Sequence, residues 1–444
     1  MNKVYQSVQF NVSGKEFFQE MVGFGVNINS KPWNDGKIIP VMELLIDELG
    51  IREFRVDMYG RANWIDPDGT LGKAALDEKH LEKVYNEPWA KNGWAMMRYL
   101  NERGIEPHLV CTGIVPDWMC ETDGKTLKDY ESLAEAVVSI TDWAKNKEKI
   151  KFHMLAPMNE TDIGPPEGPL VSPEAYVEVC KIIDRKLTER GLDDIRLLVA
   201  DQALLDPRYL SAFSKCPELA DRVAYFGLHA YSDYTVEQYN ELKPAIAGTP
   251  YANKLMLMTE YSDLDQTGEQ EWPVTWKSAN RLIDYLQGGF SGGYNWDAFD
   301  NYHEHDSSWT IYGLIRIGNH TATPKKRFYG AKNLYKYINP GIFRIGTQGC
   351  EETVRLVAFA PKDGSDLTIY GVNKSLDPAK VKISLKELPG VSHKPMHYFL
   401  TDEYNNCTMQ PDIAHYNTNL GIKMPNDDFE VIVPARSIFT FTTL

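Results

Sequence analysis

The feature that most constrains the fold is a regular alternation of short apolar runs and helical patterns between residues 23 and 338. Such alternation is typical of βα units whose strands lie parallel in one sheet. The predicted strands are residues 22–28, 53–58, 106–111, 152–156, 196–200, 224–228, 254–259 and 292–296. The predicted helices are residues 41–49, 94–103, 133–146, 174–190, 206–213, 236–242, 275–287 and 328–338. Eight strands, each followed by a helix, predict a (β/α)8 TIM barrel.

A doubly wound sheet is the alternative arrangement of parallel strands. It would carry a glycine-rich phosphate turn after its first strand. Here Gly23 and Gly25 lie inside the first predicted strand, and the third glycine of that turn is missing. The barrel is therefore the favoured fold.

The pattern changes after residues 339–341, where Asn-Pro-Gly interrupts the chain. Short alternating runs follow at residues 354–359, 367–372, 381–385, 396–401, 429–433 and 438–442. Such runs, separated by turn residues, predict a C-terminal all-β sandwich. Residues 5–12 alternate in the same way. We therefore expect residues 1–20 to add a strand to the sandwich, residues 21–339 to form the barrel, and residues 340–444 to form the sandwich.

Composition excludes several classes of partner. The chain has 62 acidic and 47 basic residues, a formal charge of −15, which disfavours nucleic acids and anionic membranes. No apolar run approaches the roughly 20 residues of a membrane span. Six scattered cysteines form no CxxC pair. The N-terminus has no apolar signal region, so we expect a cytoplasmic protein, or a secreted one if a leader has been removed. The sequence carries no signal for an oligomeric state.

Barrel enzymes place their chemistry at the carboxyl ends of the strands. Polar and aromatic residues stand at these ends along the predicted barrel. They are Arg55, Asp57, Thr112, Asn159, Glu160, Asp201, His229, Tyr231, Thr259, Glu260, Trp296 and Asp297.

Two of these residues, Glu160 and Glu260, end the fourth and seventh strands, which face each other across an eight-stranded ring. Two carboxyl groups about 5–5.5 Å apart can act as acid/base and nucleophile in retaining glycoside hydrolysis. One must be protonated and the other ionised. Arg55 and Tyr231 are candidates to bind the ionised one. Aspartates at other strand ends compete with this interpretation, and Arg55 and His229 also fit purely structural roles.

A metal site is a further alternative. The tract His303-Glu304-His305-Asp306 follows the eighth strand and resembles a metal-binding run. A metal-dependent barrel hydrolase usually carries His-x-His at its first strand, whereas this chain has Asn27-Ile28-Asn29. We therefore predict neither a metal nor an organic cofactor.

Two motifs resemble the catalytic signatures of the clan A glycoside hydrolases. They are Pro157-Met158-Asn159-Glu160 and Leu257-Met258-Thr259-Glu260-Tyr261-Ser262. The resemblance implies that Glu160 is the acid/base and Glu260 the nucleophile.

Within that clan the chain is most similar to glycoside hydrolase family 30, which includes glucosylceramidase-like, glucuronoxylanase and galactanase enzymes. The similar pieces are residues 23–25, 54–60, 116–119, 122–124 and 229–231, and residues 372–375 and 434–438 of the predicted sandwich. The chain departs from the family at Met158 and at Asp57, where the family often has proline. Residues 66–87 have no counterpart, and we expect them to form a long loop over the site. Family 39 shares the barrel, both glutamates and a β-sandwich.

The sequence thus predicts a retaining β-glycosidase that acts on a β-linked glycan. A catalytically silent glycan-binding barrel and a metal-dependent barrel hydrolase are the alternatives. Trp118, Trp64 and Tyr234 are expected to shape outer subsites. The expected substrate-binding residues are Arg55, Asn159, His229, Tyr231, Trp296, Trp118, Asn27 and Asp57.

Overall fold

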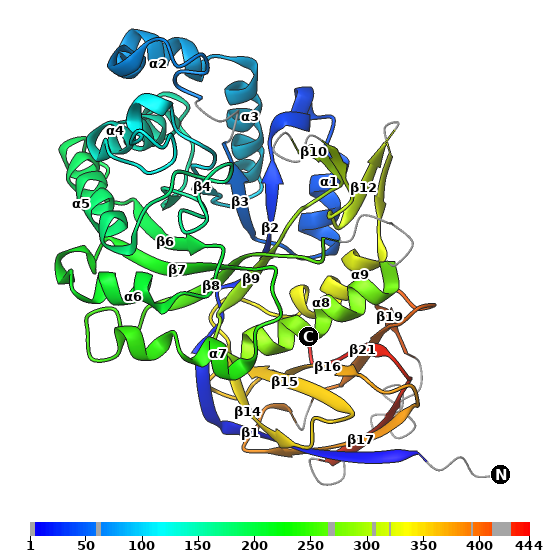
Figure 1. The fold of residues 1–444 in the computed structure, drawn as a ribbon. Helices are drawn as coiled ribbons and strands as arrows, with labels where there is room; N and C mark the ends of the chain where they lie inside the picture. The colour runs from blue at the N-terminus through cyan, green and yellow to red at the C-terminus, as the bar shows by residue number, and fades with distance from the viewer. Residues whose placement is uncertain are drawn as a thin grey trace.

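The computed structural model describes residues 5–58, 64–264, 271–303, 308–318, 321–391, 394–410 and 428–444. Eight parallel strands close into a barrel, because β9 pairs with β2 (Figure 1). They are β2 (Gly23–Asn29), β3 (Glu53–Asp57), β4 (His108–Val110), β5 (Met154–Ala156), β6 (Arg196–Gln202), β7 (Val223–Ala230), β8 (Leu255–Tyr261) and β9 (Gly292–Asn295). The predicted (β/α)8 barrel is confirmed.

Helices surround the barrel, and all but the second of them lie at the predicted places. They are α1 (Ile39–Glu43), α2 (Glu78–Tyr85), α3 (Pro88–Glu102), α4 (Tyr130–Asp142), α5 (Pro173–Glu189), α6 (Pro207–Ser214), α7 (Val236–Asn240), α8 (Glu271–Gln287) and α9 (Lys326–Tyr335). Several begin at side chains that satisfy free backbone N–H groups. Ser172 accepts a hydrogen bond from the amide of Ala175, and Thr235 forms a capping box with Gln238.

Residues 66–87 do not form the expected loop over the site. They contain a 3-10 turn, Gly72–Leu76, followed by α2. Apolar side chains of α2 are buried in the barrel core, and the Tyr85 hydroxyl lies 2.5 Å from Ser139 Oγ on α4. Leu81, Val84 and Tyr85 recur at helical spacing, which fixes one face of α2 against the barrel.

The C-terminal region is a nine-stranded sheet in the order β19-β18-β21-β16-β15-β14-β1-β17-β20. Its strands are β1 (Gln6–Glu20), β14 (Phe343–Gly349), β15 (Val354–Ala360), β16 (Thr368–Asn373), β17 (Ala379–Lys386), β18 (His397–Thr401), β19 (Thr408–Met409), β20 (Asp428–Val433) and β21 (Ser437–Thr442). β1 lies between β14 and β17, pairing antiparallel with the first and parallel with the second.

This sheet folds over itself to enclose a core. Phe429 on β20 and Phe441 on β21 have ring centroids 5.2 Å apart, although their strands are far apart in the hydrogen-bonded order. The predicted sandwich therefore forms from one continuous sheet, with apolar side chains of both layers in a single cluster.

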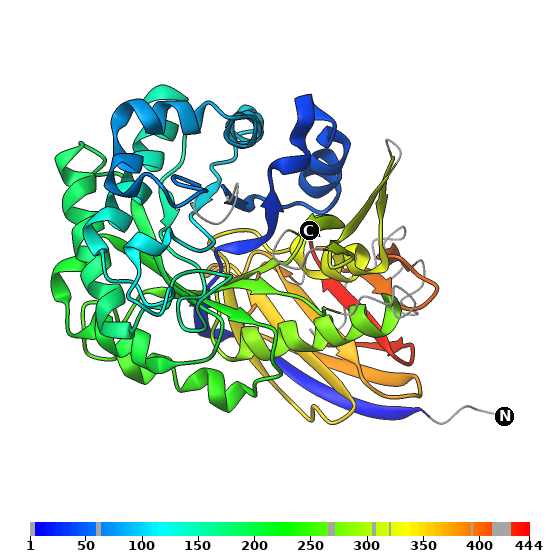
Figure 2. The same ribbon diagram turned by 45° about the horizontal axis from the view of Figure 1, so that its top comes forward.

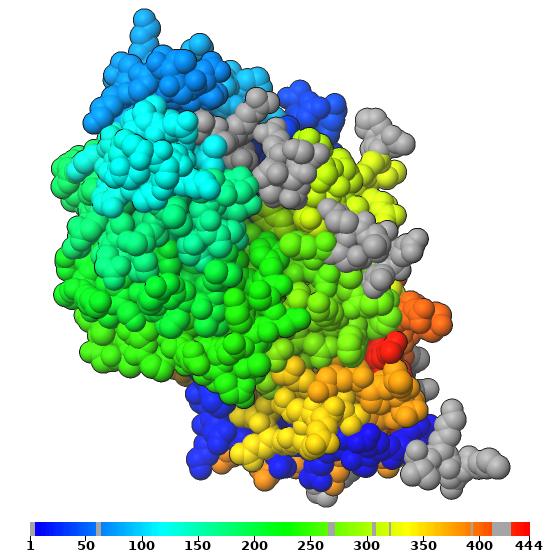
Figure 3. Space-filling model, viewed as in Figure 1, coloured from blue at the N-terminus to red at the C-terminus, as the bar shows by residue number. Residues whose placement is uncertain are grey.

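The barrel and the β domain pack closely. α8 and α9 lie against β15, β16, β18 and β21 (Figure 2). Val357 and Ile438 of the β domain belong to the apolar core of the barrel, and Arg355 forms a 2.7 Å ion pair with Asp284 on α8. Figure 3 shows the blue N-terminal strand running along the β domain, away from the rest of the N-terminal half.

Two hairpins follow β9: β10 (Asn301–His303) with β11 (Ser308–Thr310), and β12 (Ile315–Gly318) with β13 (Thr321–Pro324). The first of them borders the site described next. Among the described residues, no helix is long and apolar enough to cross a membrane.

Candidate active site

A cavity of about 350 Å³ opens at the carboxyl ends of the barrel strands. It is lined by residues from the loops after β2 to β9, including Asn29, Asp57, Thr112, Asn159, Glu160, Glu167, Tyr231, Glu260, Trp296, Tyr302 and His303. Seven of the twelve strand-end residues singled out in the sequence therefore line one cavity, as the barrel geometry requires.

Glu260 lies in this cavity at the end of β8 and is nearly buried. Arg55 Nη1 donates a 2.6 Å hydrogen bond to its Oε1, and the Tyr231 hydroxyl donates a 2.7 Å bond to its Oε2. Burial raises the pKa of Glu260, while His229 and Arg55 act against that rise by favouring the carboxylate.

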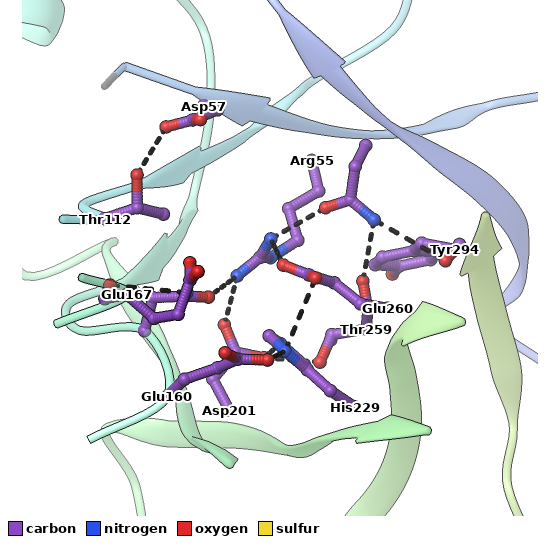
Figure 4. Close-up of polar contacts among 12 residues, drawn as sticks. Arg55, Asp57, Thr112, Glu160, Glu167, Asp201, His229, Thr259, Glu260 and Tyr294 are labelled. Atoms are coloured by element: carbon purple, nitrogen blue, oxygen red, sulfur yellow. Dashed lines mark hydrogen bonds and ion pairs between the residues drawn. The ribbon is translucent and has the colours of Figure 1, made fainter. Parts of the chain in front are cut away.

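Arg55 is the centre of a buried polar network (Figure 4). Besides Glu260, it donates bonds of 2.7 Å to Asn27 Oδ1, Asn159 Oδ1 and Asp201 Oδ2. Burial alone would lower the pKa of Arg55, but Asp201 and Glu260 raise it above the ordinary value. The guanidinium thus fixes four side chains from four strand ends in one arrangement.

Asp201 is a member of this network that sequence reasoning noted only as a strand-end residue, without a role. It is fully buried at the end of β6, where it accepts a hydrogen bond from the Thr259 hydroxyl. One carboxylate oxygen also lies 3.3 Å from His229 Nε2. Burial opposes its charge, yet Arg55 and His229 hold the pKa of Asp201 well below its usual range.

His229 bridges the two glutamates. Its Nδ1 lies 2.6 Å from Glu160 Oε1 and 3.5 Å from Glu260 Oε2. Burial lowers the pKa of His229, but Glu260, Glu160 and Asp201 raise it more, to about 10. The imidazole is therefore a cation at neutral pH, and Nδ1–H donates to Glu160.

The charges of this buried cluster do not balance unless one carboxyl group is protonated. Arg55 and His229 supply two positive charges, whereas Asp201, Glu160 and Glu260 would supply three negative ones. A buried cluster disfavours a net charge. The strongly lowered pKa of Asp201 marks it as a carboxylate of the cluster that stays ionised.

The backbone at two of these residues has an uncommon conformation. Glu160 has φ 42° and Asp201 has φ 47°, both in the left-handed region that non-glycine residues rarely adopt. The amide of Glu160 donates a 2.9 Å hydrogen bond to the Asp201 carbonyl, which holds the two turns together. Such conformations persist where the surroundings over-determine them, as at functional sites.

The other predicted substrate-binding residues fall into two groups. Asp57, which accepts a 2.7 Å bond from the Thr112 hydroxyl, and Trp296 both line the cavity. The Trp296 ring lies against His303, with centroids 5.1 Å apart. Asn27 and His229, like Arg55, do not line the cavity but lie beneath it, behind the residues that do.

Trp118, which is expected to shape an outer subsite, does not line this cavity. Its indole N–H donates a 3.0 Å hydrogen bond to Asp66. Trp64 lines a small neighbouring pocket, and the Tyr234 hydroxyl accepts a bond from the amide of Leu205 rather than facing the cavity. The sequence placed these rings near the top face, but their partners are set by long-range packing.

Metal binding has two candidate places. Donor atoms of Glu160, His229 and Glu260 lie within 4.8 Å of one another. A divalent cation there would face the Arg55 guanidinium, which already holds Glu260 at 2.6 Å, so this donor set fits a metal poorly. His303 lies 3.4 Å from Asp297, and the rest of the 303–306 tract lies outside the described residues.

No protein-family model matches the chain, and no curated protein matches it. Solved structures do. A GH30 endoxylanase from Clostridium papyrosolvens C71 matches with a TM-score of 0.72 at 17% identity, covering 98% of this chain and 99% of that one. An endo-β1,6-glucanase matches with a TM-score of 0.67 at 18% identity, covering 100% and 96%. A family 51 α-L-arabinofuranosidase from Bifidobacterium longum matches with a TM-score of 0.64 at 14% identity, covering 99% and 100%.

These matches extend over both the barrel and the β domain. The resemblance to glycoside hydrolase family 30 and its clan, expected from the motifs, is therefore confirmed at the level of the fold. The chain has the two-domain fold of these glycoside hydrolases.

Proposed function

We propose that this chain is a retaining β-glycosidase. The observation that carries the proposal is the pair Glu160 and Glu260, whose carboxylate oxygens approach within 4.8 Å across the cavity. Inverting enzymes keep their carboxyl groups about 6.5–9.5 Å apart to admit a water, whereas retaining enzymes use a shorter gap. The names of the matching structures, which include two enzymes acting on polysaccharides and one arabinofuranosidase, support a carbohydrate substrate.

Glu260 is the nucleophile of this mechanism. Its carboxylate attacks the anomeric carbon and forms a glycosyl ester, while the bond to the leaving oxygen breaks. Arg55 and Tyr231 both donate hydrogen bonds to Glu260, and such bonds favour its ionised form. They also aim the carboxylate into the cavity.

Glu160 is the acid/base. It transfers its proton to the leaving oxygen in the first step, and in the second it takes a proton from the water that attacks the anomeric carbon and releases Glu260. His229, 2.6 Å from Glu160 and 3.5 Å from Glu260, is a positioning residue that stabilises charge on either carboxylate.

The sugar is held by the residues around the two carboxyl groups. Arg55 fixes the carbonyl oxygen of Asn159, and one N–H of its side-chain amide donates a 3.5 Å bond to the Glu167 carbonyl. The second N–H is the one that binds the sugar 2-hydroxyl. Trp296 forms the floor beneath the sugar ring, and Asp57 accepts hydrogen bonds from hydroxyl groups. Asn27 and Arg55 act from beneath the cavity as positioning residues. This mechanism uses no metal or organic cofactor.

Replacement of Glu260 by alanine tests the proposal. Wild-type protein is first assayed on a panel of aryl glycosides, and proton NMR shows whether the first-formed sugar keeps the β configuration. Glu260→Ala is expected to lower kcat/KM by about 10³-fold or more. Glu53→Ala, at the opposite end of the barrel on β3, is the matched control and should stay within about threefold of wild type. Glu260→Ala activity within tenfold of wild type, or inversion of configuration, would contradict the proposal.

A further inference from the structure

A buried lysine binds both ends of the β10–β11 hairpin, which borders the catalytic cavity. Lys325 lies between β13 and α9, and its Nζ donates hydrogen bonds of 2.7 Å to Asp300 Oδ1 and of 2.7 Å to the Ile311 carbonyl. Asp300 comes directly before β10, and Ile311 comes directly after β11. One ammonium group therefore joins the two strands of the hairpin at its base.

This ammonium group lies behind the cavity wall. Lys325 is 6% exposed and Asp300 is 1% exposed, and neither residue lines the cavity. Glu271 on α8 supplies a second carboxylate, 3.7 Å from the Lys325 ammonium. Lys325 can therefore act on a bound sugar only through the residues that it holds in place.

The residues held in this way carry aromatic rings of the cavity wall. Three rings from the hairpin segment line the cavity: Tyr302, His303 and Tyr312. The centroid of the His303 ring lies 5.1 Å from that of Trp296 and 6.3 Å from that of Tyr312. A displacement of the hairpin would move His303 and remove the support of the Trp296 ring, which is the proposed floor beneath the sugar.

Arg327 holds the same part of the wall from the first turn of α9. Its Nη1 donates a 2.9 Å hydrogen bond to the carbonyl of Asp263, in the loop after β8, and a 3.4 Å bond to the carbonyl of Tyr312. Its Nε donates a 3.0 Å bond to Glu271 Oε1, the same oxygen that faces Lys325. The start of α9 thus fixes the loop after β8 and the segment after β11 relative to each other.

Stability alone does not account for a buried lysine at this place. Taking two opposite charges out of water costs several kcal/mol per ion, and an apolar pair of similar volume is often no less stable. What short, charge-assisted hydrogen bonds add is a defined geometry. Here these bonds are directed at the two ends of a single hairpin.

From this arrangement we infer that Lys325 is a positioning residue for the cavity wall and sets how strongly the enzyme discriminates between sugars. The inference rests on the proposed glycosidase function. The two catalytic glutamates are held by the separate network around Arg55. Loss of the Lys325 bonds should therefore weaken recognition of the sugar and leave the acid/base chemistry intact.

The test removes the ammonium group with and without its carboxylate partner. Lys325→Met removes the cation that binds Asp300, and Lys325→Met/Asp300→Asn removes both members of the pair, which keeps the test open if the single variant does not fold. Wild type is assayed on a panel of aryl β-glycosides that differ only in the sugar, and the kcat/KM of the best sugar is divided by that of the next best.

Both variants should lower this sugar ratio about fivefold or more. The change should come from a higher KM for the best sugar, with kcat altered by less than about threefold. Lys332→Met, which breaks the 2.9 Å ion pair between the same helix and Glu48, is the matched control and should leave the ratio unchanged. Partial unfolding lowers the amount of active protein for every sugar alike, so a merely structural role would not move the ratio.

An unchanged sugar ratio in the variants would overturn the inference. If this occurs while Glu260→Ala still abolishes hydrolysis, only the positioning role fails. If wild type hydrolyses no glycoside, the proposed function fails, and hydrogen–deuterium exchange then tests the positioning role. Peptides that contain β10 and β11 should exchange at least about tenfold faster in the double variant than in wild type. Equal exchange would contradict the inference.

Discussion

The two ends of the barrel carry similar residue types in different arrangements. At the amino ends of the strands a cavity of about 530 Å³ contains two acid–histidine pairs. Glu53 lies 3.0 Å from His108, and Glu106 lies 2.9 Å from His153. At the carboxyl ends, His229 lies near three carboxyl groups, and Arg55 binds two of the same three.

The difference lies in convergence and, for one of the two amino-end pairs, in burial. His153 and Glu106 are about half exposed, so water screens their interaction. The five ionisable groups at the carboxyl end are almost completely buried and share one network. A site able to transfer a proton therefore requires several charged groups that converge in a buried site from which water is excluded. A single acid next to a histidine is not sufficient.

The largest expected effect that separates the two ends is on catalysis. Glu160→Ala should lower kcat/KM by about 10²–10⁴-fold for glycosides with poor leaving groups, because general acid assistance is lost. Activated aryl glycosides should suffer less, and added azide should restore turnover with formation of a glycosyl azide. Glu106→Ala at the opposite end should leave the rate within about twofold of wild type. Steady-state kinetics across a leaving-group series checks this, and an unchanged leaving-group dependence would count against it.

The next effect is on stability. Arg55→Met removes the guanidinium that binds the buried Asp201 and Glu260, and the free energy of unfolding should fall by about 3–5 kcal/mol. His153→Gln, which breaks the half-exposed pair with Glu106, should cost less than about 1 kcal/mol. Urea denaturation of both variants measures the contrast. Equal losses would show that the buried network contributes no more than a surface pair.

The smallest effect is a pH dependence. Folding raises the pKa of His229 from 6.5 to about 10, so its protonation stabilises the folded protein fully below pH 6.5. That contribution is lost as pH rises toward 10. The stability difference between wild type and His229→Gln should therefore shrink between pH 6.5 and 10, by a few kcal/mol.

The measurement is urea unfolding of wild type and His229→Gln across that pH range, with His153→Gln as the control. The control should show little change relative to wild type over the same range. A wild-type advantage over His229→Gln that stays constant, or grows with pH, would show that the imidazole is not held as a cation in the folded protein.

Elements built from local periodicity could be predicted from the sequence. The strand expected at residues 106–111 is β4 (His108–Val110), and the last barrel helix, expected at 328–338, is α9 (Lys326–Tyr335). The length of the N-terminal strand was harder to predict. The strand extends to Glu20, whereas the alternation of apolar and polar residues ends near residue 12. Register shifts between Ser13 and Phe17 and between Phe17 and Glu20 interrupt the two-residue period that sequence reasoning depends on.

The parts of the site that could be predicted are those whose proximity follows from their position at the ends of the barrel strands. Glu160, Glu260 and Arg55 were brought together because they end strands of one closed ring. Asp201 ends such a strand too, but its contacts with Arg55 and His229 depend on how far each strand is staggered, which no local pattern encodes. The hydrogen bond from Trp118 to Asp66 could not be predicted for a similar reason, because Asp66 belongs to the segment at 66–87.

The position of β1 has a consequence for how the chain assembles during synthesis. β1 (Gln6–Glu20) lies in the interior of a sheet whose other strands begin at Phe343, after the whole barrel. At typical ribosomal rates this strand waits roughly 15–60 s before its first partner emerges. Through that interval both edges of β1 are open to other chains, and the barrel folds between two parts of a sheet that is completed last.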